Sequence, residues 1–210
     1  MPNDLRSDVL KVLTYSDDFW YHYTLSKDIC GCNISKEEEK QIIEKSMEAA
    51  EEMQAMVTNQ YAGFSGKELA EALNLNIVYR SEEEQDLMLG LFTPSNRSIT
   101  MNSPVIERIK GKIEYNQLGD LTPAQDIETV TLYHEIFHAL EEATPDIYTR
   151  SKMIKRKLLK VIPYSRALDG ASEIGAIHFS KCMAGISYSP CIFEYYLFMN
   201  NTSKSIDFFH

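Results

Sequence analysis

Hydrophobic residues recur at intervals of three or four along much of the chain, which is the spacing of amphipathic α-helices. Between these stretches, three short segments alternate hydrophobic and polar residues or are rich in β-branched and aromatic residues, as strands are. Helices are expected over residues 5–13, 35–59, 65–73, 122–143, 150–160, 169–183 and 191–199, with another beginning at Ser103. Strands are expected over residues 76–80, 89–93 and 98–102.

Capping signals locate the starts of three of these helices. Ser35 and Ser65 are each followed three residues later by a glutamate, the pattern of a capping box. Thr122 precedes Pro123 and Gln125, so Thr122 is the expected N-cap of the helix that follows.

The second and third strands are separated by residues 94–97, Pro-Ser-Asn-Arg, which is turn chemistry. They are therefore expected to form a hairpin. Helices dominate the rest of the chain, so the pattern predicts an α+β fold, mainly helical, with a small and largely antiparallel sheet ahead of the helix at 122–143.

Composition narrows the function classes. The chain of 210 residues has 21 basic and 31 acidic side chains, a net charge of −10, which disfavours direct binding to nucleic acid or to an anionic membrane. The start of the chain does not have the pattern of a signal peptide, and no window is apolar enough for a transmembrane helix. We expect a cytoplasmic protein that has no membrane partner and whose cysteines are reduced.

Residues 134–138, His-Glu-Ile-Phe-His, form an HExxH motif within an expected helix. Residues four apart lie one turn apart on the same helical face, so His134 and His138 can bind one metal ion. Glu135 lies beside them, where a carboxylate can take a proton from a metal-bound water. The alternative is two histidines that only pack, without a ligand role.

A catalytic zinc site needs a third protein ligand and one open position. Glu173 is the first candidate, because it lies on a downstream helix next to the small residues Gly175 and Ala176, which permit close helix packing. His178 is a rival, but it points about 140° away from Glu173 on an ideal helix. Asp169 is a further acidic alternative.

Bound Zn²⁺ would activate water for attack on an amide, with Glu135 as general base. Tyr164 and His178 are candidates by residue type for stabilising the oxyanion, although packing is the preferred explanation for each. Ile99, Thr100 and Met101 are expected to pair with an extended peptide if residues 98–102 form an exposed strand edge. An interior strand without a ligand role is the alternative.

The order of these parts resembles the ImmA/IrrE family of zinc metallopeptidases, in the thermolysin-like (gluzincin) group. The resemblance covers roughly residues 65–185 and rests on segments 68–73, 77–79, 90–92, 95–97, 99–102, 134–140 and 173–179. It implies a zincin-like domain. We expect this domain over residues 61–210, with residues 1–60, which have no counterpart in the family, as a helical extension packed on it. The resemblance also implies zinc, Glu173 as third ligand, and a peptide or protein substrate such as a transcriptional repressor.

One position departs from the family pattern. Ile177 stands where the family usually has Asn or Asp, so the polar contact expected there is missing or replaced. A zinc-dependent peptidase is the first functional hypothesis. The alternatives are a non-catalytic zinc-binding interaction protein and a small-molecule amidohydrolase.

Overall fold

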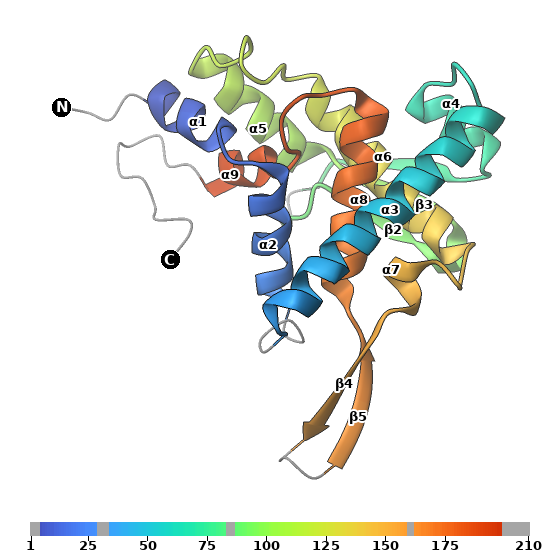
Figure 1. The fold of residues 1–210 in the computed structure, drawn as a ribbon. Coiled ribbons are helices and arrows are strands. Elements are labelled where there is room, and N and C mark those ends of the chain that lie inside the picture. The colour runs from blue at the N-terminus through green and yellow to red at the C-terminus, as the bar shows by residue number, and fades with distance from the viewer. Residues whose placement is uncertain (1–4, 29–33, 83–86, 159–161, 199–210) are drawn as a thin grey trace.

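The computed structural model describes residues 5–28, 34–82, 87–158 and 162–198. Its described helices are α1 (Leu5–Leu13), α2 (Asp17–Lys27), α3 (Lys36–Gln60), α4 (Gly66–Ala72), α5 (Ser103–Tyr115), α6 (Asp126–Glu142), α7 (Tyr148–Ser151), α8 (Asp169–Ala184) and α9 (Ile192–Phe198), with a 3₁₀ turn, η1 (Pro94–Asn96). Its described strands are β1 (Asn76–Arg80), β2 (Gly90–Thr93), β3 (Ser98–Asn102), β4 (Met153–Leu158) and β5 (Ile162–Ala167). The α+β fold expected from the sequence is confirmed: helices predominate around a small sheet (Figure 1).

The three-stranded sheet is mixed, and its strand order is β1-β3-β2. β2 and β3 form the expected antiparallel hairpin, whereas β1 runs parallel to β3. The expectation of a largely antiparallel sheet therefore missed the β1–β3 pairing. β1 and β3 are separated in the sequence by β2. Local sequence patterns do not predict a pairing between segments that are distant in the chain.

β3 is the central strand, so the expectation that residues 98–102 form an exposed edge is wrong. Ile99 and Met101 are fully buried beneath the helices, and Thr100 pairs with β1 on one side and β2 on the other. A peptide cannot pair with a strand whose two sides are already occupied. Among the described strands of this sheet, β1 and β2 are the edges.

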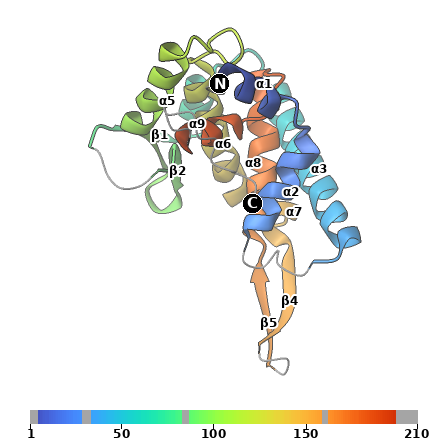
Figure 2. The same ribbon diagram turned by 90° about the vertical axis from the view of Figure 1, so that its left-hand side faces the viewer.

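A single hydrophobic core runs through the molecule. It includes Trp20 and Leu25 of α2, Ile42 of α3, Ile136 of α6 and Ile174 of α8, each with almost no exposed surface. The helices α6 and α8 lie side by side at its centre, and α3 crosses α8 (Figures 1 and 2). The first 60 residues thus share their apolar core with the rest of the chain, and the domain division at residue 60 stays a prediction.

The structure differs from the sequence-based expectation for one segment predicted as a helix and for the start of another helix. The basic segment 150–160 was expected to be a helix, but α7 ends at Ser151 and the chain enters the strand β4. The helix α6 begins at Asp126 rather than after Thr122, whose buried hydroxyl instead lies 2.6 Å from the hydroxyl of Tyr196. Packing against α9 outweighs the local capping signal at Thr122.

None of the described helices is long and apolar enough to cross a membrane.

Candidate metal centre

The helix α6 carries the HExxH motif through the middle of the molecule. Ile127, Val130, Ile136 and Phe137 are buried on several of its sides, because the sheet and α8 both pack against it. His134 and His138 keep 22% and 20% of their side chains exposed, so both imidazoles border a solvent-accessible space.

The two histidines and Glu173 converge on one point. The Nε2 atoms of His134 and His138 are 3.2 Å apart. The Glu173 carboxylate, on α8, lies 3.4 Å from His134 Nε2 and 3.6 Å from His138 Nε2. Nitrogen and oxygen ligands about 2.1 Å from a tetrahedral Zn²⁺ would lie roughly 3.4 Å from one another. The three donors therefore have the chemistry and the separations that a zinc ion requires.

Glu135 is set apart from these three donors. Its side chain is buried, and its Oε2 accepts a 2.7 Å hydrogen bond from the backbone N–H of Phe92 in β2. β2 passes so close that a Cβ added to Gly90 would meet Glu135 Cγ at 2.8 Å and Oε1 at 2.9 Å. The strand thus fixes the carboxylate next to His134 in the chain, and Glu135 is not one of the three converging donors.

The second ring nitrogen of His138 faces a polar pair, the buried Glu141 and the partly buried Ser172. Its Nδ1 lies 3.6 Å from Glu141 Oε2 and 3.3 Å from Ser172 Oγ, and the Ser172 hydroxyl donates a 2.7 Å hydrogen bond to the same Glu141 oxygen. A carboxylate behind a metal-binding histidine orients its ring and strengthens it as a ligand. Sequence reasoning missed Glu141, although it lies three residues after His138 on the same helical face.

The charges of the site shift its pKa values. Burial lowers the pKa of His138, but the hydrogen bond with Glu141 and the charges of Glu173 and Glu135 outweigh it and raise the pKa to about 9. Burial raises the pKa of Glu173, but hydrogen bonding and charge from His134, together with His138, lower it to about 2. Three carboxylates around two imidazoles make a strongly negative site, which favours a divalent cation.

A cleft of about 740 Å³ is lined by His134, Glu135, His138 and Glu173. Its walls are the start of β2 with the residues before it, α6, α8, the C-terminal end of α2, and α9. Leu91, Phe193 and Leu197 make part of the lining apolar, and Ile177 contributes to it from α8. An apolar side chain thus lines the cleft at the position where the family that the sequence motifs resemble usually has Asn or Asp.

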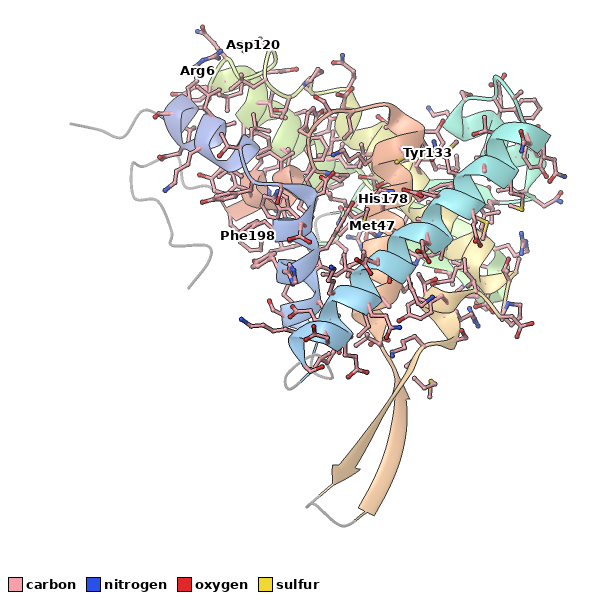
Figure 3. The ribbon with its side chains drawn as sticks, viewed as in Figure 1. Arg6, Met47, Asp120, Tyr133, His178 and Phe198 are labelled. Atoms are coloured by element: carbon pink, nitrogen blue, oxygen red, sulfur yellow. The ribbon has the colours of Figure 1, made fainter. Side chains whose placement is uncertain are left out.

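The remaining candidates lie elsewhere. His178 is on another side of α8, where its Nδ1 lies 2.8 Å from the Tyr21 hydroxyl and its Nε2 3.3 Å from Glu51 of α3; Figure 3 shows it beside α3. Asp169 lines the cleft without joining the three converging donors. Tyr164 is in β5, and its side chain lies outside the described part of the structure.

Comparison with known proteins adds no second line of evidence. No protein-family model matches the chain, and neither the curated proteins nor the solved structures give a significant match. The likeness to ImmA/IrrE peptidases therefore rests on the sequence motifs alone.

Proposed function

We propose that the protein is a zinc-dependent metallopeptidase. The observation that carries the proposal is the separation of the three donors of His134, His138 and Glu173, which lie 3.2 to 3.6 Å apart with Glu135 held beside them. A chance cluster of acidic and histidine side chains would not need a second carboxylate, that of Glu135, fixed by a backbone hydrogen bond. Zinc catalysis requires both features.

Each residue has a defined part in this proposal. His134, His138 and Glu173 would hold the ion, and Glu141 with Ser172 would fix the ring of His138. A bound zinc ion supplies a Lewis acid that acidifies water and polarises a carbonyl oxygen. Glu135 accepts the proton of the attacking water and passes it to the leaving amine.

The shape of the cleft favours a peptide as substrate. β2 is an edge strand of the described sheet and forms one wall of the cleft, so an extended chain can lie along it. Apolar side chains from α8 and α9 would receive substrate side chains. A small-molecule amidohydrolase would not need a strand edge in its wall. Repressor substrates and a cytoplasmic location rest on the family resemblance.

The test is Glu135→Gln, because this change removes the proton acceptor and leaves the three ligand side chains in place. Purified wild-type protein should bind about one zinc ion per chain. We expect the variant to bind zinc equally well and to lose at least about 100-fold in kcat on a peptide substrate. Zinc content by atomic absorption and peptide hydrolysis by mass spectrometry measure the two quantities.

A non-catalytic zinc protein gives a different result. The apolar Ile177 in the cleft is the observation that favours this second candidate. In that case Glu135→Gln would change neither zinc binding nor cellular function, and His134→Ala would abolish both. A folded wild-type protein with negligible affinity for zinc would contradict both candidates.

A further inference from the structure

The strands β4 and β5 form an arm that leaves the helical body. They form a two-stranded antiparallel sheet of their own, from Met153 paired with Ala167 to Leu158 paired with Ile162. Figures 1 and 2 show this arm extending away from the helices in both views. Isolated two-stranded hairpins are only marginally stable in water. A partner strand that paired with the arm would add packing to it.

The arm is joined to the candidate metal centre at its base. The backbone N–H of Leu168 donates a 3.2 Å hydrogen bond to the carbonyl of Lys152, which closes the base of the arm. α8 begins at the next residue, and its first two residues, Asp169 and Gly170, line the cleft. A chain bound along the arm would therefore arrive at one end of the cleft.

The charge of the arm is opposite to that of the rest of the protein. Residues 150–166 contain seven of the 21 basic side chains and no acidic one. The other 14 basic and 31 acidic residues give the remainder of the chain a net charge of −17. Arg150 and Lys152, at the base of the arm, form ion pairs with Glu142 and Glu38. Four of the remaining basic residues, Lys155, Arg156, Lys157 and Arg166, belong to β4 and β5.

The arm also has apolar positions and open backbone edges. Because successive residues of a strand lie on opposite faces, Lys155 and Lys157 lie on one face of the hairpin, and Ile154 and Leu158 lie on the other with Arg156. In the described structure each strand pairs only with the other, which leaves the outer edge of both for a third strand. A DNA backbone would match the basic residues but not the apolar ones, and the −17 charge of the rest would repel it.

We propose that the β4–β5 arm is a docking site for an extended segment of the protein substrate that alternates acidic and apolar residues. The segment adds to the arm as a third strand and leads the adjoining chain into the cleft. The inference rests on the proposed peptidase function, because only a peptidase would have a protein substrate to dock. Binding to the arm itself requires neither zinc nor catalysis.

The binding test uses the full chain carrying Glu135→Gln, so that no probe is cut. The probe is a fluorescein-labelled peptide of about twelve residues that alternates Glu and Val, measured by fluorescence anisotropy. A second peptide alternates Lys and Val, and a third probe is a DNA duplex of about 20 base pairs. The arm variant carries Lys155→Gln, Arg156→Gln and Lys157→Gln. Its matched control changes three exposed lysines elsewhere, Lys11, Lys36 and Lys40, to Gln, with the same loss of charge.

We expect the Glu-Val peptide to bind the unmodified arm and the control alike, and the arm variant roughly tenfold more weakly, since three exposed charges that can pair with Glu are lost. The Lys-Val peptide should not bind. Equal binding of the Glu-Val peptide to the arm variant and the control would overturn the proposal. So would tighter binding of the DNA duplex than of the Glu-Val peptide.

A cleavage test separates this inference from the proposed function. The substrate is a peptide cut by the wild-type protein, with and without a Glu-Val extension of the same composition. The extension should lower KM for wild type and control but not for the arm variant, with kcat unchanged in all three. If hydrolysis occurs and the extension has no effect, the docking proposal is wrong and the peptidase stands. If Glu135→Gln protein binds the probe through the arm while wild type cuts nothing, the peptidase proposal is wrong and the docking site stands.

Discussion

At the scale of single residues, the missing side chain of Gly90 lets β2 fix the position of Glu135. The backbone of β2 touches the side chain of Glu135, and the Phe92 N–H fixes the carboxylate by a hydrogen bond. Only a residue without a Cβ lets the strand come this close. The sequence places Gly90 in an expected strand. The need for glycine there arises because side chains of α6 pack directly against β2.

Gly90→Ala should therefore impair catalysis without removing a ligand. Its Cβ would lie 2.8 Å from Thr131 Cγ2 and from Glu135 Cγ, so these side chains must shift. We expect a loss of about 1–3 kcal/mol in the free energy of unfolding from overpacking. A displaced proton acceptor should also lower kcat by about 100-fold while zinc stoichiometry is unchanged.

Urea denaturation, zinc analysis and peptide hydrolysis check this prediction against Gly111→Ala as control. Gly111 lies in α5 with no heavy atom near the position of its Cβ, so alanine there should keep activity and slightly stabilise the helix. Full activity in a folded Gly90→Ala protein would show that β2 does not position Glu135.

At the scale of elements, the end of α2 caps α8, the helix that carries Glu173. Leu168 is the N-cap of α8 and has no side chain that can accept a hydrogen bond from the first turn. Asp28, one residue beyond α2, accepts a 2.7 Å hydrogen bond from the Gly170 N–H. A second contact, of 2.5 Å, joins Asp17 of α2 to Lys181 near the other end of α8. The helix with Glu173 is thus fixed at both ends by a segment distant in sequence.

Asp28→Ala removes the capping acceptor, and we expect it to cost about 1 kcal/mol in the free energy of unfolding. Because Glu173 lies in the turn after this cap, zinc affinity should fall by about tenfold as the start of α8 loosens. Competition with a chelating indicator measures the affinity. Asp28→Asn keeps an acceptor oxygen and should lose less of both. An alanine variant with unchanged stability and affinity would contradict a capping role for Asp28.

Elements whose signals are local were predictable from the sequence. Ser35 and Ser65 accept hydrogen bonds from the N–H groups of Glu38 and Glu68, so both predicted N-caps are confirmed. The HExxH spacing likewise placed His134 and His138 on one helical face, because four residues make about one turn.

Features that depend on distant segments were not predictable in the same way. The basic residues of 150–160 recur as they would on an exposed helix, yet Met153–Leu158 pairs with Ile162–Ala167 as a strand. The contact of Ser172 with Glu141 joins two helices and has no local pattern. Glu173 was proposed as a ligand, but its distance to the histidines depends on how α6 and α8 pack.

At the scale of the whole molecule, Glu128 connects four elements at the start of α6. Its carboxylate accepts a 2.9 Å hydrogen bond from the Tyr79 hydroxyl of β1 and lies 3.4 Å from Lys110 of α5 and 4.0 Å from Lys67 of α4. Burial raises the pKa of Glu128, but Tyr79 and the two lysines outweigh it and lower the pKa below its ordinary value of 4.5. Folding therefore favours the ionised form of this side chain.

This lowered pKa makes part of the stability depend on pH. Above the ordinary pKa of about 4.5 the carboxylate is charged in both states, and its contribution to folding is fully present. As the pH falls through the lower pKa of the folded state, protonation removes the contribution.

With one third of the Glu128 side chain exposed, solvent screening limits its contribution to stability to about 0.5–1 kcal/mol. Glu128→Gln should therefore lower the free energy of unfolding by this amount at pH 7, and the difference from wild type should shrink toward zero below about pH 4. Urea denaturation at several pH values measures it, with the exposed Glu114→Gln of α5 as control. A difference that stayed constant across this range would show that the charge of Glu128 does not stabilise the junction of the sheet with the helices.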